Sequence, residues 1–135
     1  MTIKTQNEIL TDFFNVVKVS PILALNGGIY KKTRPTDSKL EDCIISIING
    51  QNGKFQQTSL LIVKIFYNDI QQGATYLDDS TNGQAKEKLL IDLSATFLKL
   101  ANYSFFIETR ETYIEQVEEI KQHYAVLRMN FTYLN

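Results

Sequence analysis

The stretch AVLRMNFTY, residues 125–133, alternates apolar and polar side chains more regularly than any other part of the chain. One face carries Ala125, Leu127, Met129, Phe131 and Tyr133, and the other carries Arg128, Asn130 and Thr132. Successive side chains of a strand point to opposite faces of a sheet, so this period of two predicts a strand with one face on a core. The final element is therefore predicted to be a half-buried β-strand, opened by His123.

Four further segments have the composition of strands. Residues 55–68 are the longest, and they place Leu61, Val63, Ile65 and Tyr67 on one side and Leu60, Ile62, Lys64 and Phe66 on the other. Lys64 indicates that this second side meets water. Residues 43–49 are short and rich in isoleucine, as in a strand that is buried on both faces. Residues 29–32 and 103–109 predict two shorter strands.

Two segments predict amphipathic helices. Thr5 and Glu8 have the spacing of a capping box, and the helical pattern then runs to Ser20 and Pro21 with the apolar residues Ile9, Leu10, Phe13, Phe14, Val16 and Val17. Thr81 and Gln84 repeat the capping spacing before a second helix. Its expected buried side is formed by Ala85, Leu89, Leu90, Leu93, Phe97, Leu98 and Ala101, with Lys86, Glu87, Lys88, Asp92 and Lys99 off that side.

The order of these elements predicts the fold class. It reads helix, three strands, helix, two strands, without a repeated strand–helix–strand unit. We therefore expect an α+β domain with a mainly antiparallel sheet of about five strands and two helices packed on one face. A chain of 135 residues has the size of one domain, so residues 1–135 are expected to form a single domain.

Two polar segments are expected to connect these elements. Residues 69–83 are too long for a tight turn, which makes them the best candidate for a mobile functional loop. The charged segment ETYIEQVEEIKQ, residues 111–122, leads to the last strand.

Composition narrows the possible environments and partners. The formal net charge of −1 gives no general attraction to nucleic acid or to acidic membranes. The single cysteine, Cys43, cannot form an internal disulfide, which favours synthesis inside a cell. The N-terminus has no signal-peptide pattern, and the longest apolar run, LLIV, stops at Lys64. No membrane partner is expected.

No catalytic or metal-binding motif is present. His123 is the only histidine, and the sequence offers neither a residue to orient it nor a set of metal ligands, so a structural or surface role is expected. Cys43 begins an isoleucine run, where a thiol behaves as a small buried hydrophobic group. The pairs Glu41–Asp42 and Asp78–Asp79 are predicted to be solvated loop charge. The glycine-rich stretches predict turns. The residues therefore predict no cofactor and no metal.

A group of charged and aromatic residues lies ahead of the isoleucine-rich strand: Tyr30, Lys31, Lys32, Arg34, Glu41 and Asp42. A solvated loop is the default interpretation. Basic residues beside an aromatic ring can also follow a nucleic-acid backbone, although three charges are few for that. A loop with both signs of charge can instead dock on a complementary loop of a neighbouring copy, where charge fixes orientation more than it adds affinity.

The stretch GGIYKKTRPTDSKLEDCIISI, residues 27–47, resembles the N-terminal signature of a tail terminator, or tail-completion, family of long-tailed bacteriophages. A preceding helix, IFYND at residues 65–69, a second amphipathic helix and HYAVLRMNF at residues 123–131 continue the resemblance over most of the chain. The residues after IFYND carry no distinctive motif of that family.

The resemblance implies a non-enzymatic protein that forms a ring, a hexamer, on the last ring of the tail tube. There it stops tube polymerisation and presents the surface that the head connector binds. The implied partners are other copies of the chain, the tail tube protein and the head connector, and nucleic acid only passes through the lumen of the ring. The implied location is the host cytoplasm during assembly and then the head–tail junction of the virion.

A cyclic ring needs a heterologous interface, in which one patch meets a different patch on the next copy. We therefore expect the charged group from Tyr30 to Asp42 to make a contact with another subunit or with the head. The 69–83 loop, with Asp78 and Asp79, is expected to meet the tube or the connector.

Three other functions fit the same residues. Another head–tail joining protein, or a ring or tube component of the tail, has no feature here that separates it from a terminator. A small nucleic-acid-binding module needs a coherent basic face. A small enzyme needs a pocket that brings together distant residues such as His123 and Glu41.

Overall fold

The computed structural model of the chain describes residues 5–20, 24–52, 56–97, 104–117 and 120–134. Within them the elements are α1 (Gln6–Lys18), β1 (Ile29–Lys31), β2 (Cys43–Asn52), β3 (Gln56–Asn68), β4 (Ile70–Gln72), β5 (Thr75–Leu77), α2 (Ser80–Phe97), β6 (Ser104–Val117) and β7 (Gln122–Leu134). Pro21, Phe55, Tyr103 and the predicted helix end at Leu98–Ala101 lie outside the described residues. The predicted α+β class is confirmed.

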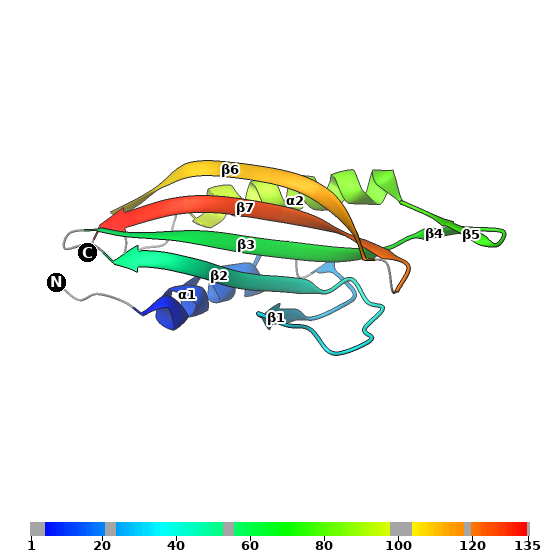
Figure 1. The fold of residues 1–135 in the computed structure, drawn as a ribbon, viewed down its shortest axis with the longest axis horizontal. Helices are drawn as coiled ribbons and strands as arrows, with labels where there is room; N and C mark the ends of the chain where they lie inside the picture. The colour runs from blue at the N-terminus through cyan, green and yellow to red at the C-terminus, as the bar shows by residue number, and fades with distance from the viewer. Residues whose placement is uncertain (1–4, 21–23, 53–55, 98–103, 118–119, 135) are drawn as a thin grey trace.

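One five-stranded sheet forms the body of the molecule. Its strand order is β1-β2-β3-β7-β6, in which β1 runs parallel to β2 and every other neighbouring pair is antiparallel. Both helices cover the same face of this sheet, and the opposite face has no helix on it (Figure 1). The sheet therefore has one face on the core and one that no element of the described chain covers.

The core lies between the two helices and the covered face of the sheet. Helix α1 begins at the predicted capping box, in which Thr5 and Glu8 bond to each other's backbone, and it then buries Ile9, Leu10, Phe13 and Val17. The ring of Phe13 meets Phe97 of α2 at 4.8 Å between centroids and Phe131 of β7 at 5.0 Å. These edge-on aromatic contacts join both helices to the sheet.

The alternation that predicted the two central strands is confirmed. The buried side of β3 carries Leu61, Val63, Ile65 and Tyr67, and the buried side of β7 carries Ala125, Leu127, Met129 and Phe131. The side chain of Tyr133 is outside those described. On the uncovered face of β3, Lys64 is partly exposed and its ammonium lies 5.0 Å from the centre of the Tyr124 ring, so the predicted wet face is also confirmed.

The predicted connection at 111–122 is wrong, because residues up to Val117 belong to β6. They pair with β7 throughout, from Glu111 opposite Arg128 to Val117 opposite Gln122. Charged residues are tolerated there because β6 is an edge strand, and charge on an edge strand opposes unwanted pairing. Because this segment is rich in charged residues, it lacks the alternation of apolar and polar side chains that predicts a strand.

The predicted 69–83 loop is also wrong, because β4 and β5 form a separate two-stranded hairpin within it. Gly73 makes the turn with a φ of +63°, a left-handed conformation that glycine adopts without strain. Helix α2 begins at Ser80, and the Asp79 carboxylate accepts the Asn82 N–H at 3.2 Å. Asp79 therefore caps the helix in place of the predicted Thr81.

Strand β2 is longer than predicted and is not buried on both faces. Cys43, Ile44 and Ile45 are buried, but Ile48 is 44% exposed. Ile48 points to the face without helices and lies beyond Ile45, the last residue of β2 that pairs with β1.

Candidate functional site

The charged residues at the mouth of β2 are bonded within the chain. The Asp42 carboxylate is fully buried and lies 2.8 Å from the Nε of Arg34, whose side chain is only 10% exposed. Asp42 also accepts the Gly28 N–H at 3.0 Å and the Ser38 hydroxyl at 2.5 Å. A Cβ on Gly27 would collide with this carboxylate, so the predicted turn glycine also makes room for it.

Arg34 fixes the loop between β1 and β2. Its guanidinium donates to the carbonyls of Ser38 at 2.7 Å and Leu40 at 3.2 Å, and to the Gln122 side chain at 3.1 Å. It also stacks 3.9 Å from the centre of the Phe66 ring. The predicted solvated loop charge is therefore wrong for Asp42 and Arg34, because an internal ion pair compensates both charges and withdraws them from water.

Glu41 joins this loop to the start of α2. Its carboxylate lies 3.2 Å from the Nζ of Lys86 and accepts the Asn82 side-chain amide at 3.2 Å. Lys86 is buried although the sequence places it off the buried side, and Ala85, predicted to be buried, is exposed. The acidic partner explains the burial of the lysine, since a buried charge requires an opposite charge.

Lys31 and Lys32 reach toward α1. The Nζ of Lys31 donates to the Thr11 hydroxyl at 2.9 Å, and the Nζ of Lys32 donates to the Asn7 side chain at 3.4 Å. Both lysines are exposed, and Tyr30 is partly buried. The predicted group thus divides into a buried pair, Arg34 and Asp42, and a set at or near the surface, Tyr30, Lys31, Lys32 and Glu41.

His123 has a partner that the sequence does not predict. Its Nδ1 lies 2.5 Å from Asp69 and 3.9 Å from Asp78, which stand at the two ends of the β4–β5 hairpin. The Tyr67 hydroxyl donates to Asp78 at 2.7 Å, and burial together with this hydrogen bond raises the pKa of Tyr67. The contacts among Tyr67, Asp69, Asp78 and His123 therefore hold the base of the hairpin against the sheet. The pairing of β3 with β7 places Tyr67 opposite His123, and the hairpin that follows β3 brings Asp78 to them.

The hairpin itself exposes large apolar side chains. It extends beyond the end of the sheet along the long axis of the molecule (Figure 1). Ile70, Tyr76 and Leu77 are 50%, 40% and 45% exposed. Asp78 follows the hairpin and is exposed, whereas Asp79 is partly buried as the cap of α2.

Cys43 is fully buried at the start of β2, as the sequence predicts. Burial, with a smaller effect of the Asp42 charge, raises the pKa of its thiol to about 12. The thiolate is the reactive form, so burial and the raised pKa both protect this thiol at pH 8. We expect a colorimetric thiol reagent to leave the native protein unlabelled at pH 8 and to label it fully in denaturant. Rapid labelling of the folded protein would contradict this burial.

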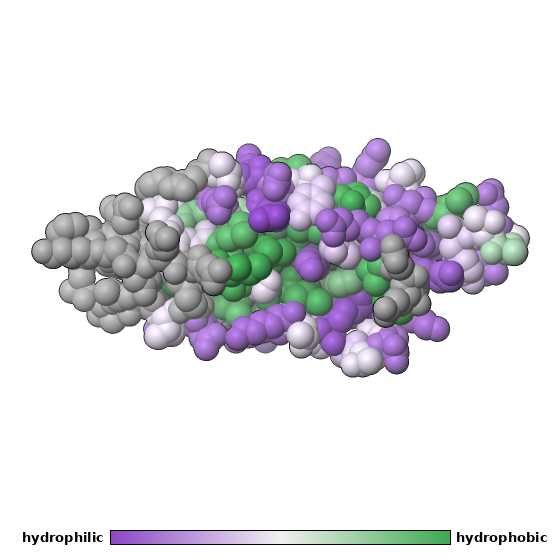
Figure 2. Space-filling model, viewed as in Figure 1, coloured by the Kyte–Doolittle hydropathy of each residue, from purple (hydrophilic) through white to green (hydrophobic). Residues whose placement is uncertain are grey.

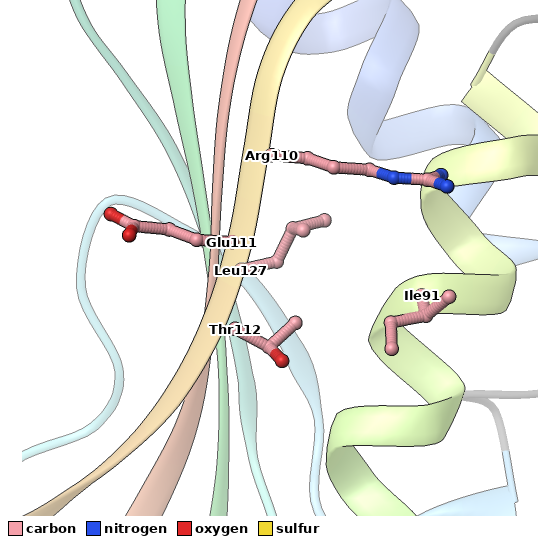
Figure 3. Close-up of a pocket in the computed structure, with 5 residues that line it drawn as sticks. All are labelled: Ile91, Arg110, Glu111, Thr112 and Leu127. Atoms are coloured by element: carbon pink, nitrogen blue, oxygen red, sulfur yellow. The ribbon is translucent and has the colours of Figure 1, made fainter.

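A pocket of about 180 Å³ lies between α2 and the edge of the sheet. Figure 3 shows Arg110, Thr112 and Leu127 pointing from the strands toward Ile91 on α2, while Glu111 points to the other face. Arg110 donates to the Ser94 hydroxyl at 2.9 Å. Among the described residues, the pocket is lined by the apolar Ile91 and Leu127, by Thr112, and by the charged Arg110 and Glu111.

The uncovered face of the sheet carries an apolar patch. In Figure 2 the patch appears green in the middle of this face. The residues that point to this face from β2 and β3 include Ile44, Ile48, Leu60 and Ile62, and only the first is buried. Tyr124 lies on the same face of β7 and donates its hydroxyl to Glu115 at 2.6 Å. Burial and this hydrogen bond raise the pKa of Tyr124 to about 12.

Both edges of the sheet are open over long stretches. Within the described residues, β6 pairs only with β7, and the outer side of β2 pairs with β1 only from Cys43 to Ile45. The backbone groups on the outer sides of β6 and of Ser46–Asn52 therefore have no strand partner in the described part of the chain. Unpaired strand edges of this kind are templates for pairing with another chain.

Comparisons with known proteins add no relative. No model of a known protein family matches the chain, and a search of curated proteins finds no match. Within the described residues, no helix is long and apolar enough to cross a membrane, and no group of three or more His, Cys, Asp or Glu side chains is placed to hold a metal ion.

Proposed function

We propose that the protein is a non-enzymatic structural protein of a long-tailed phage, which forms a ring at the end of the tail tube. The ring stops polymerisation of the tube and offers the surface on which the head connector docks. The resemblance of residues 27–47, 65–69 and 123–131 to tail terminators supports this proposal. Its partners are then other copies of the chain, the tube protein and the connector.

The observation that carries the proposal is the relation between the two open edges of the sheet. In the sheet, each of the strands β2, β3, β7 and β6 is antiparallel to the next one. As a result, β2 and β6 lie at opposite edges and run in opposite directions. A rotation about an axis along the strands keeps their direction. Hence β6 of one copy meets β2 of the next in antiparallel orientation, and the contact can repeat until the ring closes.

The remaining features fit a ring of this kind. Lys31 and Lys32 are exposed near the β2 edge, where they can contact the next subunit, as proposed from the sequence. The hairpin projects along the strand direction, which is the direction of the ring axis, so its apolar side chains face a neighbouring ring of the tube or connector (Figure 1). Asp78 and Asp79 stand at the base of that contact.

A single glutamate on the open part of β2 tests the proposal. Ile48 is 44% exposed on this edge, and Ile48→Glu is expected to convert the ring to monomer, because a charge on an edge strand opposes pairing. The matched control is Val19→Glu, since Val19 is 82% exposed beyond the end of α1. This control is expected to have the same particle mass as the wild type.

The measurement is light scattering after size exclusion, over a range of concentrations, with circular dichroism to confirm folding. A wild type of one ring-sized mass supports a terminator, whereas long polymers support a tube component. A wild type that stays monomeric at every concentration, or an Ile48→Glu variant with the wild-type mass, would overturn assembly through this edge.

A further inference from the structure

We infer that β1 sets the register in which β6 of one copy pairs with β2 of the next copy. The inference rests on the proposed ring and names the surface by which its subunits join. Its occupant is a second copy of this chain, and the contact joins Thr112–Val117 of β6 to Ser46–Asn52 of β2. Val117 lies opposite Ser46, and Thr112 lies opposite Asn52, because β2 carries a one-residue β-bulge between Ile48 and Gln51.

The first step is that β1 blocks the beginning of β2. Ile29 pairs with Cys43 and Lys31 pairs with Ile45, so this part of the outer edge is occupied. The Lys32 N–H then donates to the Ile45 carbonyl at 2.9 Å. Lys32 has a left-handed φ of 70°, which turns the chain away from the sheet. Within the described residues, no strand therefore pairs with the outer edge of β2 from Ser46 onward.

The second step is the direction of the incoming strand. An antiparallel β6 that passes along β2 from Asn52 toward Ser46 advances toward its own end at Val117. Any register that carries β6 beyond Ser46 drives it into β1 of the neighbour. The longest pairing that avoids this collision ends β6 opposite Ser46. The β-bulge in β2 between Ile48 and Gln51 then places Asn49 and Gly50 opposite Ile114, so that Gln51 and Asn52 lie opposite Tyr113 and Thr112.

The third step is that the side chains agree with this register. Ile48 meets Glu115 on the uncovered face, and Ile47 meets Gln116 on the helix side, so these four residues keep the faces that their own sheets give them. No like charges meet, since Ser46–Asn52 contains no charged residue. The half-exposed Ile48 is covered by the stem of Glu115, whose carboxylate already accepts the Tyr124 hydroxyl.

Disulfide trapping tests this register. Residues directly opposite one another on antiparallel strands have Cα atoms about 4.5–5.5 Å apart, which suits a disulfide. We expect the double variant Ile48→Cys with Glu115→Cys to form, on oxidation, a ladder of linked chains that ends at the ring. The native Cys43 is fully buried and does not compete. The matched control pairs Ile48→Cys with Thr109→Cys, which lies on the same face of β6 outside the predicted contact. It is expected to form no ladder.

The outcomes separate the register from the proposed function when light scattering of the reduced variants accompanies the trapping. A ladder from the double variant alone supports the register. Ring-sized particles without a ladder overturn the register and leave the ring in place. Linked dimers from Glu115→Cys alone show that β6 pairs with itself and overturn the register. A monomer without crosslinks overturns both the register and assembly through these edges.

Discussion

Replacement of Arg34 by methionine is expected to lower the free energy of unfolding by about 3–5 kcal/mol, since it leaves a buried carboxylate without its cation. Asp42 is fully buried and 2.8 Å from Arg34, and the same guanidinium holds the carbonyls of Ser38 and Leu40. Methionine keeps much of the volume over Phe66 but provides no donor. Chemical denaturation of the isolated protein measures the loss.

Arg128→Met is the matched control. Arg128 is 43% exposed, and its Nε is 3.9 Å from Glu111, which is 66% exposed. Because exposed ion pairs contribute about 0–1 kcal/mol, this variant is expected to remain near the wild type. Adding Asp42→Asn to Arg34→Met is expected to cost less than the sum of the single variants, since the unpaired charge is then removed. Equal losses for Arg34→Met and Arg128→Met would contradict the buried pair.

Phe13→Ala is expected to lower the free energy of unfolding by about 3–5 kcal/mol, because it opens a cavity at the centre of the core. The Phe13 ring is 1% exposed and contacts Phe97 and Phe131, so one deletion removes the contact that joins α1 to both α2 and the sheet. Thermal or chemical unfolding measures the change.

The neighbouring Phe14→Ala is the control for this substitution. Phe14 is only partly buried, and the Nζ atoms of Lys18 and Lys31 lie 5.6 and 5.1 Å from the centre of its ring. Phe14→Ala is expected to lower the free energy of unfolding by no more than about 1–2 kcal/mol, in the range of ordinary substitutions. If Phe14→Ala were the more damaging variant, the orientation of α1 on the sheet would be wrong.

The sequence predicts the elements that have one buried face. In β3 and β7 the alternation is strong because one side of each strand is fully buried, and in α1 the capping box and the apolar period agree. The strands that the sequence does not predict are those without such a face. The β4–β5 hairpin, within residues 69–83, buries neither of its strands, and residues 111–117 lie on the edge of the sheet. Neither segment therefore carries a hydrophobic period.

The candidate site was less predictable because its contacts join residues distant in sequence. Arg34 and Asp42 are close in the chain, but their burial depends on Phe66 and Gln122 of other strands. The pairing of Asp69 with His123 follows from the register of β3 with β7, and the pairing of Glu41 with Lys86 follows from the position of α2. Composition and spacing give no information about such pairs.

The resemblance to tail terminators predicts a ring, and electron microscopy of the purified protein tests this central claim most directly. Negatively stained particles at high protein concentration are expected to be closed rings of a single size, with a central hole and rotational symmetry higher than two-fold. Particles that are only monomers, or dimers with two-fold symmetry, would contradict a ring built through the β2 and β6 edges.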